Sequence, residues 1–96
     1  MFGFSRGVNY GDLVKNGAYI VDVRTRNEFS TGHINGSVNI PLNELKEGMS
    51  AINKGSVIII CCASGLRSAS AKNVLMTMGY KTVFNGGPYL TLASKI

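Results

Sequence analysis

Short β-rich apolar runs alternate with stretches of helical spacing along the chain. The strongest run covers residues 57–61, with four β-branched residues and a cysteine, and it predicts a central strand. Residues 18–23 are apolar and end in charge, which suits a strand buried on both faces. Residues 37–40, stopped by Pro41, and residues 82–84 predict two shorter strands.

Helical segments are predicted between these strands. The clearest is residues 68–78, where the apolar positions fall near helical spacing and Gly79 follows as the C′ residue. Asn9 and Gly17 bound a short helix over residues 10–15. Thr25 and Glu28 fit a capping box that opens a brief helix ended by Gly32. Three further segments complete the prediction: a helical turn or two over residues 42–47, a turn over residues 85–88 and a weak helix over residues 89–94.

Strands separated by helices at this spacing indicate the α/β class. We expect a central parallel sheet of about four to five strands with helices on both faces. The 96 residues fit one small domain, residues 1–96. A hydrophobic content of 45% with only 16% charged residues excludes a disordered chain.

Several classes of protein are disfavoured by the sequence. No apolar run approaches the roughly 20 residues that cross a bilayer. The start of the chain shows no secretory signal, so the expected compartment is the cytoplasm. Cys61 and Cys62 are adjacent and are expected to be free thiols. Together with His33 they are too few for a metal site, and neither a metal nor another cofactor is indicated.

The net charge of +5 is unevenly distributed. All five acidic residues precede residue 48, where basic residues balance them. The charged residues of the second half are all basic, and they are Lys54, Arg67, Lys72, Lys81 and Lys95. They are scattered singly without aromatic partners, which disfavours nucleic-acid binding. We expect instead a field that attracts small anions to a site in this half.

The candidate site is the loop from Cys62 to Arg67. It follows the central strand, and ligands of open α/β sheets gather at the carboxyl ends of the strands. Gly65 gives the loop the freedom to point backbone N–H groups inward as an anion-binding nest. These groups, the helix N-terminus and Arg67 all favour a Cys62 thiolate, which is a nucleophile. Arg67 is expected to contact an anion.

The other residues of this segment carry less information. Cys61 ends an apolar strand and is expected to be a core residue. Ser64 fits loop hydrogen bonds, and Ser68 fits either a helix-start hydrogen bond or a ligand contact. Ala63 and Leu66 are small or apolar and indicate little about the ligand.

Two segments of the chain resemble the signatures of rhodanese domains. The first comprises Val21-Asp22-Val23-Arg24, Glu28-Phe29, Gly32-His33-Ile34, Gly36-Ser37 and Asn39-Ile40-Pro41-Leu42. The second comprises a hydrophobic strand, Cys62-x-x-Gly65-x-Arg67-Ser68, an alanine-containing helix, Gly79-Tyr80 and Gly86-Gly87. Both occur in order, and the resemblance covers roughly residues 9–90. The chain departs from the pattern at Tyr89, near which many members have a tryptophan.

The resemblance implies a sulfurtransferase with a persulfide at Cys62. Backbone N–H groups of residues 63–67 would cradle the persulfide, with Ser68 beside them. The outer sulfur would pass from a small anionic donor, such as thiosulfate or a persulfide, to cyanide or to a thiol, including a thiol carried by a protein. A monomer is expected.

The resemblance also suggests a supporting polar set of Asp22, Arg24, Glu28 and His33. Each has a structural alternative: Asp22 and Arg24 pair at a strand end, Glu28 completes the capping box, and His33 satisfies a turn.

Two other functions remain open at this point. A phosphatase of the Cys-x5-Arg type would count from Cys61 to Arg67, but Cys61 is still within the predicted strand. A non-catalytic binding module is the other alternative, although such modules commonly lack the cysteine.

Overall fold

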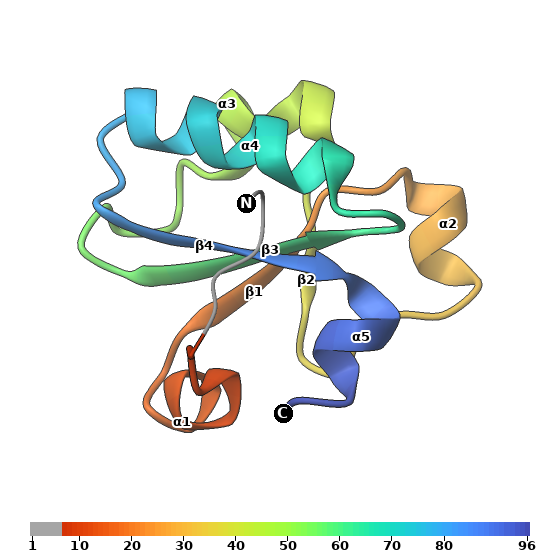
Figure 1. Ribbon diagram of the computed structural model, residues 1–96. Helices are drawn as coiled ribbons and strands as arrows, with labels where there is room; N and C mark the ends of the chain where they lie inside the picture. The colour runs from red at the N-terminus through yellow and green to blue at the C-terminus, as the bar shows by residue number, and fades with distance from the viewer. Residues whose placement is uncertain (1–6) are drawn as a thin grey trace.

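A four-stranded parallel sheet forms the centre of the computed structural model, which describes residues 7–96. The strand order is β2-β1-β3-β4 (Figure 1). The strands are β1 (Tyr19–Asp22), β2 (Val38–Asn39), β3 (Val57–Cys62) and β4 (Thr82–Pro88). The predicted α/β class with a parallel sheet is confirmed. The first residues, on which the absence of a secretory signal was judged, lie outside the described range.

Helices cover both faces of the sheet, as the sequence predicted. Figure 1 shows α3 and α4 on one face and α1 and α5 on the other, with α2 beside the edge where the strands end. The helical segments are α1 (Tyr10–Lys15), α2 (Arg26–Ser30), the 3₁₀ turn η1 (Leu42–Glu44), α3 (Leu45–Gly48), α4 (Leu66–Thr77) and α5 (Tyr89–Ala93). Within the described part of the chain, none of these helices has the length and apolar character needed to cross a bilayer.

The central strand β3 is buried on both faces because side chains alternate along a strand. Ile58, Ile60 and Cys62 belong to the core under α3 and α4. Ile59 and Cys61 belong to the core under α1 and α5. The two adjacent cysteines therefore point to opposite faces of the sheet.

Strand β4 is longer than the sequence predicted. The expected turn over residues 85–88 is wrong, because the strand runs on to Pro88. The pairing shifts between Ile60 and Cys61 of β3, which face Asn85 and Gly87, so Gly86 is the extra residue of a bulge. A Cβ at Gly86 would lie 3.0 Å from Ile59 and 3.1 Å from the Ile60 carbonyl oxygen. Gly86 therefore serves close strand packing.

Candidate active site

The strand-to-helix connection after β3 is tighter than predicted. Cys62 is the last residue of β3 rather than the first residue of a loop. Helix α4 begins at Leu66, two residues before the predicted start, so only residues 63–65 link the two elements. Gly65 precedes the helix with a φ of 96°, a left-handed conformation that glycine adopts without steric cost. This turn folds the chain back over the Cys62 side chain.

Three polar groups surround the Cys62 sulfur. The Gly65 backbone N–H donates to Sγ at 2.9 Å, and the Ser68 backbone N–H donates at 3.4 Å. The Ser68 Oγ lies 3.5 Å from Sγ. The cradle around Sγ thus includes Ser68, which lies beyond the segment of residues 63–67 that the resemblance implied. Within that segment the Leu66 N–H turns away and donates to Ser64 Oγ at 3.4 Å.

Opposite environments shift the pKa values of the two cysteines in opposite directions. Burial acts to raise the pKa of Cys62, but hydrogen bonds from the Ser68 hydroxyl and from backbone N–H groups of the turn outweigh burial and hold this pKa below its ordinary value. Burial raises the pKa of Cys61 to about 12, and the nearby Asp22 carboxylate adds to the rise. Only Cys62 is favoured as a thiolate.

Arg67 forms an ion pair that the sequence did not predict. Its guanidinium donates to both carboxylate oxygens of Glu28, at 2.7 and 2.9 Å. Hydrogen bonds from Arg67, and then from the Thr25 N–H, lower the pKa of Glu28 to about 2. The predicted capping box of Thr25 and Glu28 is also present. The Glu28 carboxylate therefore caps α2 and also binds the Arg67 side chain at the start of α4.

Asp22 and Arg24 pair at the end of β1, as the structural alternative predicted. The Arg24 guanidinium donates to the Asp22 carboxylate at 2.7 Å, and both side chains are almost fully buried. Arg24 also donates to the Gly32 carbonyl oxygen at 2.7 Å. Tyr89, near which rhodanese domains commonly have a tryptophan, stacks on this guanidinium, with Arg24 Cζ 3.7 Å from the ring centroid. The buried pair joins β1 to the segment after α2 and to the start of α5.

The remaining predicted residues lie around the turn or away from it. Ala63, Ser64 and Leu66 are exposed on its outer surface. His33 is not brought to the sulfur: its ring stacks on Phe29, and Nδ1 lies 2.8 Å from the Phe29 carbonyl oxygen. His33 thus follows its structural alternative.

Asn85 is a site residue that the sequence analysis missed. Its side chain is fully buried and contacts Ser68 Oγ at 2.6 Å through Oδ1 and the Gly65 carbonyl oxygen at 3.3 Å through Nδ2. The sequence signal was the polar residue directly before Gly86-Gly87, which was assigned to a turn. Because β4 continues through it, Asn85 points into the structure beside the turn that covers Cys62.

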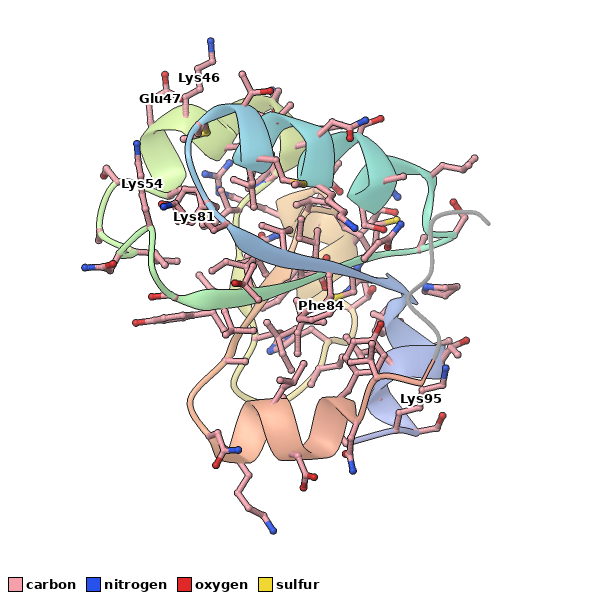
Figure 2. All side chains as sticks on the ribbon, turned by 60° about the vertical axis from the view of Figure 1, so that its left-hand side comes forward. Lys46, Glu47, Lys54, Lys81, Phe84 and Lys95 are labelled. Atoms are coloured by element: carbon pink, nitrogen blue, oxygen red, sulfur yellow. The ribbon has the colours of Figure 1, made fainter. Side chains whose placement is uncertain are left out.

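Positive charge is less concentrated at this site than the sequence suggested. Lys54 and Lys81 precede β3 and β4, so they lie at the opposite end of the sheet from Cys62 (Figure 2). Arg67 is already paired with Glu28. Two of the five basic residues of the second half thus lie away from the turn, where backbone N–H groups supply the positive potential nearest to Sγ.

Several known proteins are similar to this chain in sequence and in fold. The family model for the rhodanese-like domain matches residues 9–87. Thiosulfate sulfurtransferase PspE of Escherichia coli is 36% identical over 69 residues, which cover 70% of this chain and 66% of PspE. The putative sulfur carrier protein YrkF of Bacillus subtilis is 39% identical over 69 residues, 72% of this chain but only 37% of YrkF. The chain thus spans less than two thirds of the length of either relative.

Solved structures agree with this assignment. A structure described as rhodanese with anions from E. coli superposes with a TM-score of 0.73 at 34% identity, covering 78% of this chain and 91% of that one. The human single-domain sulfurtransferase TSTD1 reaches a TM-score of 0.81 and covers 100% of this chain and 99% of its own, but at 24% identity it supports the fold alone. Because the family model, related sequences and solved structures all match, the chain belongs to the rhodanese-like domain family.

Proposed function

We propose that the protein is a sulfurtransferase in which Cys62 carries a sulfur atom as a persulfide. The observation that supports this most strongly is the placement of N–H donors around Sγ, at 2.9 Å from Gly65 and 3.4 Å from Ser68. These donors stabilise negative charge on sulfur. Relatives named thiosulfate sulfurtransferases make the same chemistry the natural choice for this chain.

The proposed reaction has two displacement steps. The Cys62 thiolate attacks the outer sulfur of thiosulfate, a bond forms between Sγ and that sulfur, and the bond from that sulfur to the sulfite group breaks. Sulfite leaves with the bonding electron pair. A thiolate or cyanide then attacks the outer sulfur, and the Cys62 thiolate departs. Neither step needs an external oxidant, because one bond to the transferred sulfur replaces another.

The turn of residues 63–65 covers the proposed nucleophile. Cys62 is 0% exposed, whereas Ala63 and Ser64 of the turn are exposed. Gly65 is held by the bond from its N–H to Sγ and by the bonds that its carbonyl oxygen accepts from Ala69 and Asn85. We therefore propose that Ala63 and Ser64, rather than Gly65, shift aside to admit a donor to Sγ.

The partners and compartment follow from the same chemistry. We propose a small anionic sulfur donor and a thiol acceptor, which a partner protein could carry, and a monomeric enzyme. Both cysteines, each within the described residues, are free. Free thiols are typical of reducing compartments, and we therefore propose the cytoplasm.

The phosphatase alternative is disfavoured by the position of Cys61. It requires a nucleophile six positions before Arg67, which is Cys61, and that residue is buried in the core under α1 and α5 with its pKa raised to about 12. Its side chain also faces away from the turn, on the other side of the sheet from Cys62.

Two serine variants test the proposal. Cys62→Ser should keep the fold and lose thiosulfate:cyanide sulfur transfer, because an unactivated hydroxyl is a poor nucleophile. Cys61→Ser should keep sulfur transfer and lose about 1–3 kcal/mol of stability, since it buries a hydroxyl in an apolar core. Aryl phosphate hydrolysis is measured on the same samples. Transfer by Cys62→Ser, or hydrolysis that depends on Cys61, would contradict the proposal.

A further inference from the structure

Three buried polar side chains form a continuous chain from the nucleophile into strand β4. Cys62 Sγ lies 3.5 Å from Ser68 Oγ, and Ser68 Oγ lies 2.6 Å from Asn85 Oδ1. All three residues are 0% exposed. They come from β3, α4 and β4, so this series of polar contacts links three elements at the carboxyl edge of the sheet.

The orientation of the Asn85 amide is fixed by its other neighbours. Its Oδ1 accepts a hydrogen bond from the Gly87 N–H at 2.9 Å, and its Nδ2 donates to the Gly65 carbonyl oxygen at 3.3 Å. Exchanging the two atoms would set a donor against the N–H and an acceptor against the carbonyl. Asn85 therefore presents an acceptor, Oδ1, to Ser68.

Ser68 has one hydroxyl proton for two acceptors of interest. While Cys62 is a thiol, its S–H donates to Ser68 Oγ, and the Ser68 proton goes to Asn85 Oδ1. When Cys62 is a thiolate, Sγ needs that proton as a hydrogen-bond donor. The Gly65 carbonyl oxygen, 3.1 Å from Ser68 Oγ, already accepts from the Ala69 N–H. Cys62 Sγ and Asn85 Oδ1 therefore compete for the Ser68 hydroxyl proton.

We propose that Asn85 is a positioning residue that holds the Ser68 hydroxyl proton while the sulfur is uncharged and yields it to Sγ when the thiolate forms. The rotation leaves Oδ1 with only the Gly87 N–H, facing a Ser68 lone pair at short range. Asn85 thereby opposes the thiolate, whereas Ser68 supports it.

This inference rests on the proposed function for its role in turnover. The inner sulfur of a persulfide carries no charge, so the Ser68 proton returns to Asn85 once sulfur has been loaded. The hydroxyl then follows the charge on Sγ through both steps. Asn85 favours the states in which Sγ itself carries no charge, which are the free thiol and the loaded persulfide.

Charged and titratable groups around Cys62 set a background that the test must hold constant. They are Arg67 of α4, which interacts with Cys62 and Asp22; Glu28 of α2, which pairs with Arg67; Arg24, which follows β1; and Cys61 of β3. None of them touches Asn85 through a hydrogen bond of the described structure. Substitutions at Asn85 and Ser68 leave all of these charges in place.

The test measures the pH dependence of Cys62 alkylation, which needs no sulfur donor. Asn85→Leu, which keeps the branching of the side chain at Cγ, should lower the midpoint by about 0.5–1 pH unit, the effect of one hydrogen bond. Asn85→Ala is a second variant if leucine does not fit. Ser68→Ala should raise the midpoint.

The double variant decides whether Asn85 acts through Ser68. In a Ser68→Ala background, Asn85→Leu or Asn85→Ala should produce no further shift. Val83→Ala, a core substitution in the same strand, is the control for general loosening and should leave the midpoint unchanged. A midpoint that does not fall in the Asn85 variants, or one that falls equally without Ser68, would overturn the inference. If the midpoints shift as expected but the wild-type protein transfers no sulfur, the result would instead count against the proposed function.

Discussion

At the scale of single residues, one peptide bond separates two cysteines with opposite properties. Side chains alternate across β3, so Cys61 enters the core under α1 and α5 while Cys62 lies under the turn that precedes α4. Only the second position is within reach of the N–H groups that the turn and the helix start provide. Reactivity therefore depends on position in the strand rather than on residue type.

The buried thiol of Cys61 predicts a loss of stability at alkaline pH. Its pKa is raised from an ordinary 9.0 to about 12 in the folded chain. The unfolded state therefore releases this proton first, so the stability from the neutral thiol is complete below about pH 9 and is lost as the pH rises toward 12. Urea unfolding in reductant should show a steeper decline for wild type than for Cys61→Ala between about pH 8 and 11. Parallel declines would contradict the prediction.

At the scale of elements, periodicity and capping signals predicted the order of strands and helices. These signals fail where contacts between residues distant in sequence determine the local conformation. Asn85-Gly86-Gly87-Pro88 has the composition of a turn, but pairing with β3 makes it a bulged strand, and the glycines are needed because Ile59 and Ile60 lie against Gly86. Local sequence cannot show that neighbour.

The site follows the same rule. Cys62, Gly65 and Ser68 are close in sequence, so the resemblance to a known segment located them. Arg67 and Glu28 are 39 residues apart, and only the fold shows that α2 brings its capping carboxylate to α4. Asn85 became visible only once β4 was known to pass beside Ser68. Local motifs thus predicted the nucleophile, whereas long-range packing determined its supporting contacts.

At the scale of the whole molecule, the net charge of +5 is distributed rather than focused. The protein is 29 Å in its longest dimension, and Lys54 and Lys81 lie at the end away from Cys62. The Debye length is about 10 Å at 0.1 M salt, so these charges are largely screened from the turn. Arg67 is the basic side chain at the start of α4, where the proposed anionic donor would approach.

This distribution predicts a difference between basic residues. Arg67→Gln should raise the apparent KM for thiosulfate roughly threefold to tenfold, because it removes the guanidinium beside the turn and leaves the Glu28 carboxylate unpaired there, where it repels an anionic donor. Lys54→Gln and Lys81→Gln remove the same charge elsewhere and should change KM by less than about twofold at 0.1 M salt. Steady-state transfer kinetics on the three variants make the comparison. An equal rise in all three would show that net charge, rather than Arg67, attracts the donor.

The central claim is that Cys62 accepts a sulfur atom, and intact-mass measurement tests it most directly. Reduced protein is mixed with thiosulfate, and its mass is recorded before and after addition of cyanide. We predict a gain of one sulfur atom on Cys62, release of sulfite and loss of the added mass with cyanide. Cys61→Ser should behave alike, and Cys62→Ser should gain nothing. A wild-type protein that takes up no sulfur from thiosulfate or from a persulfide donor, or one that loads Cys61, would contradict the claim.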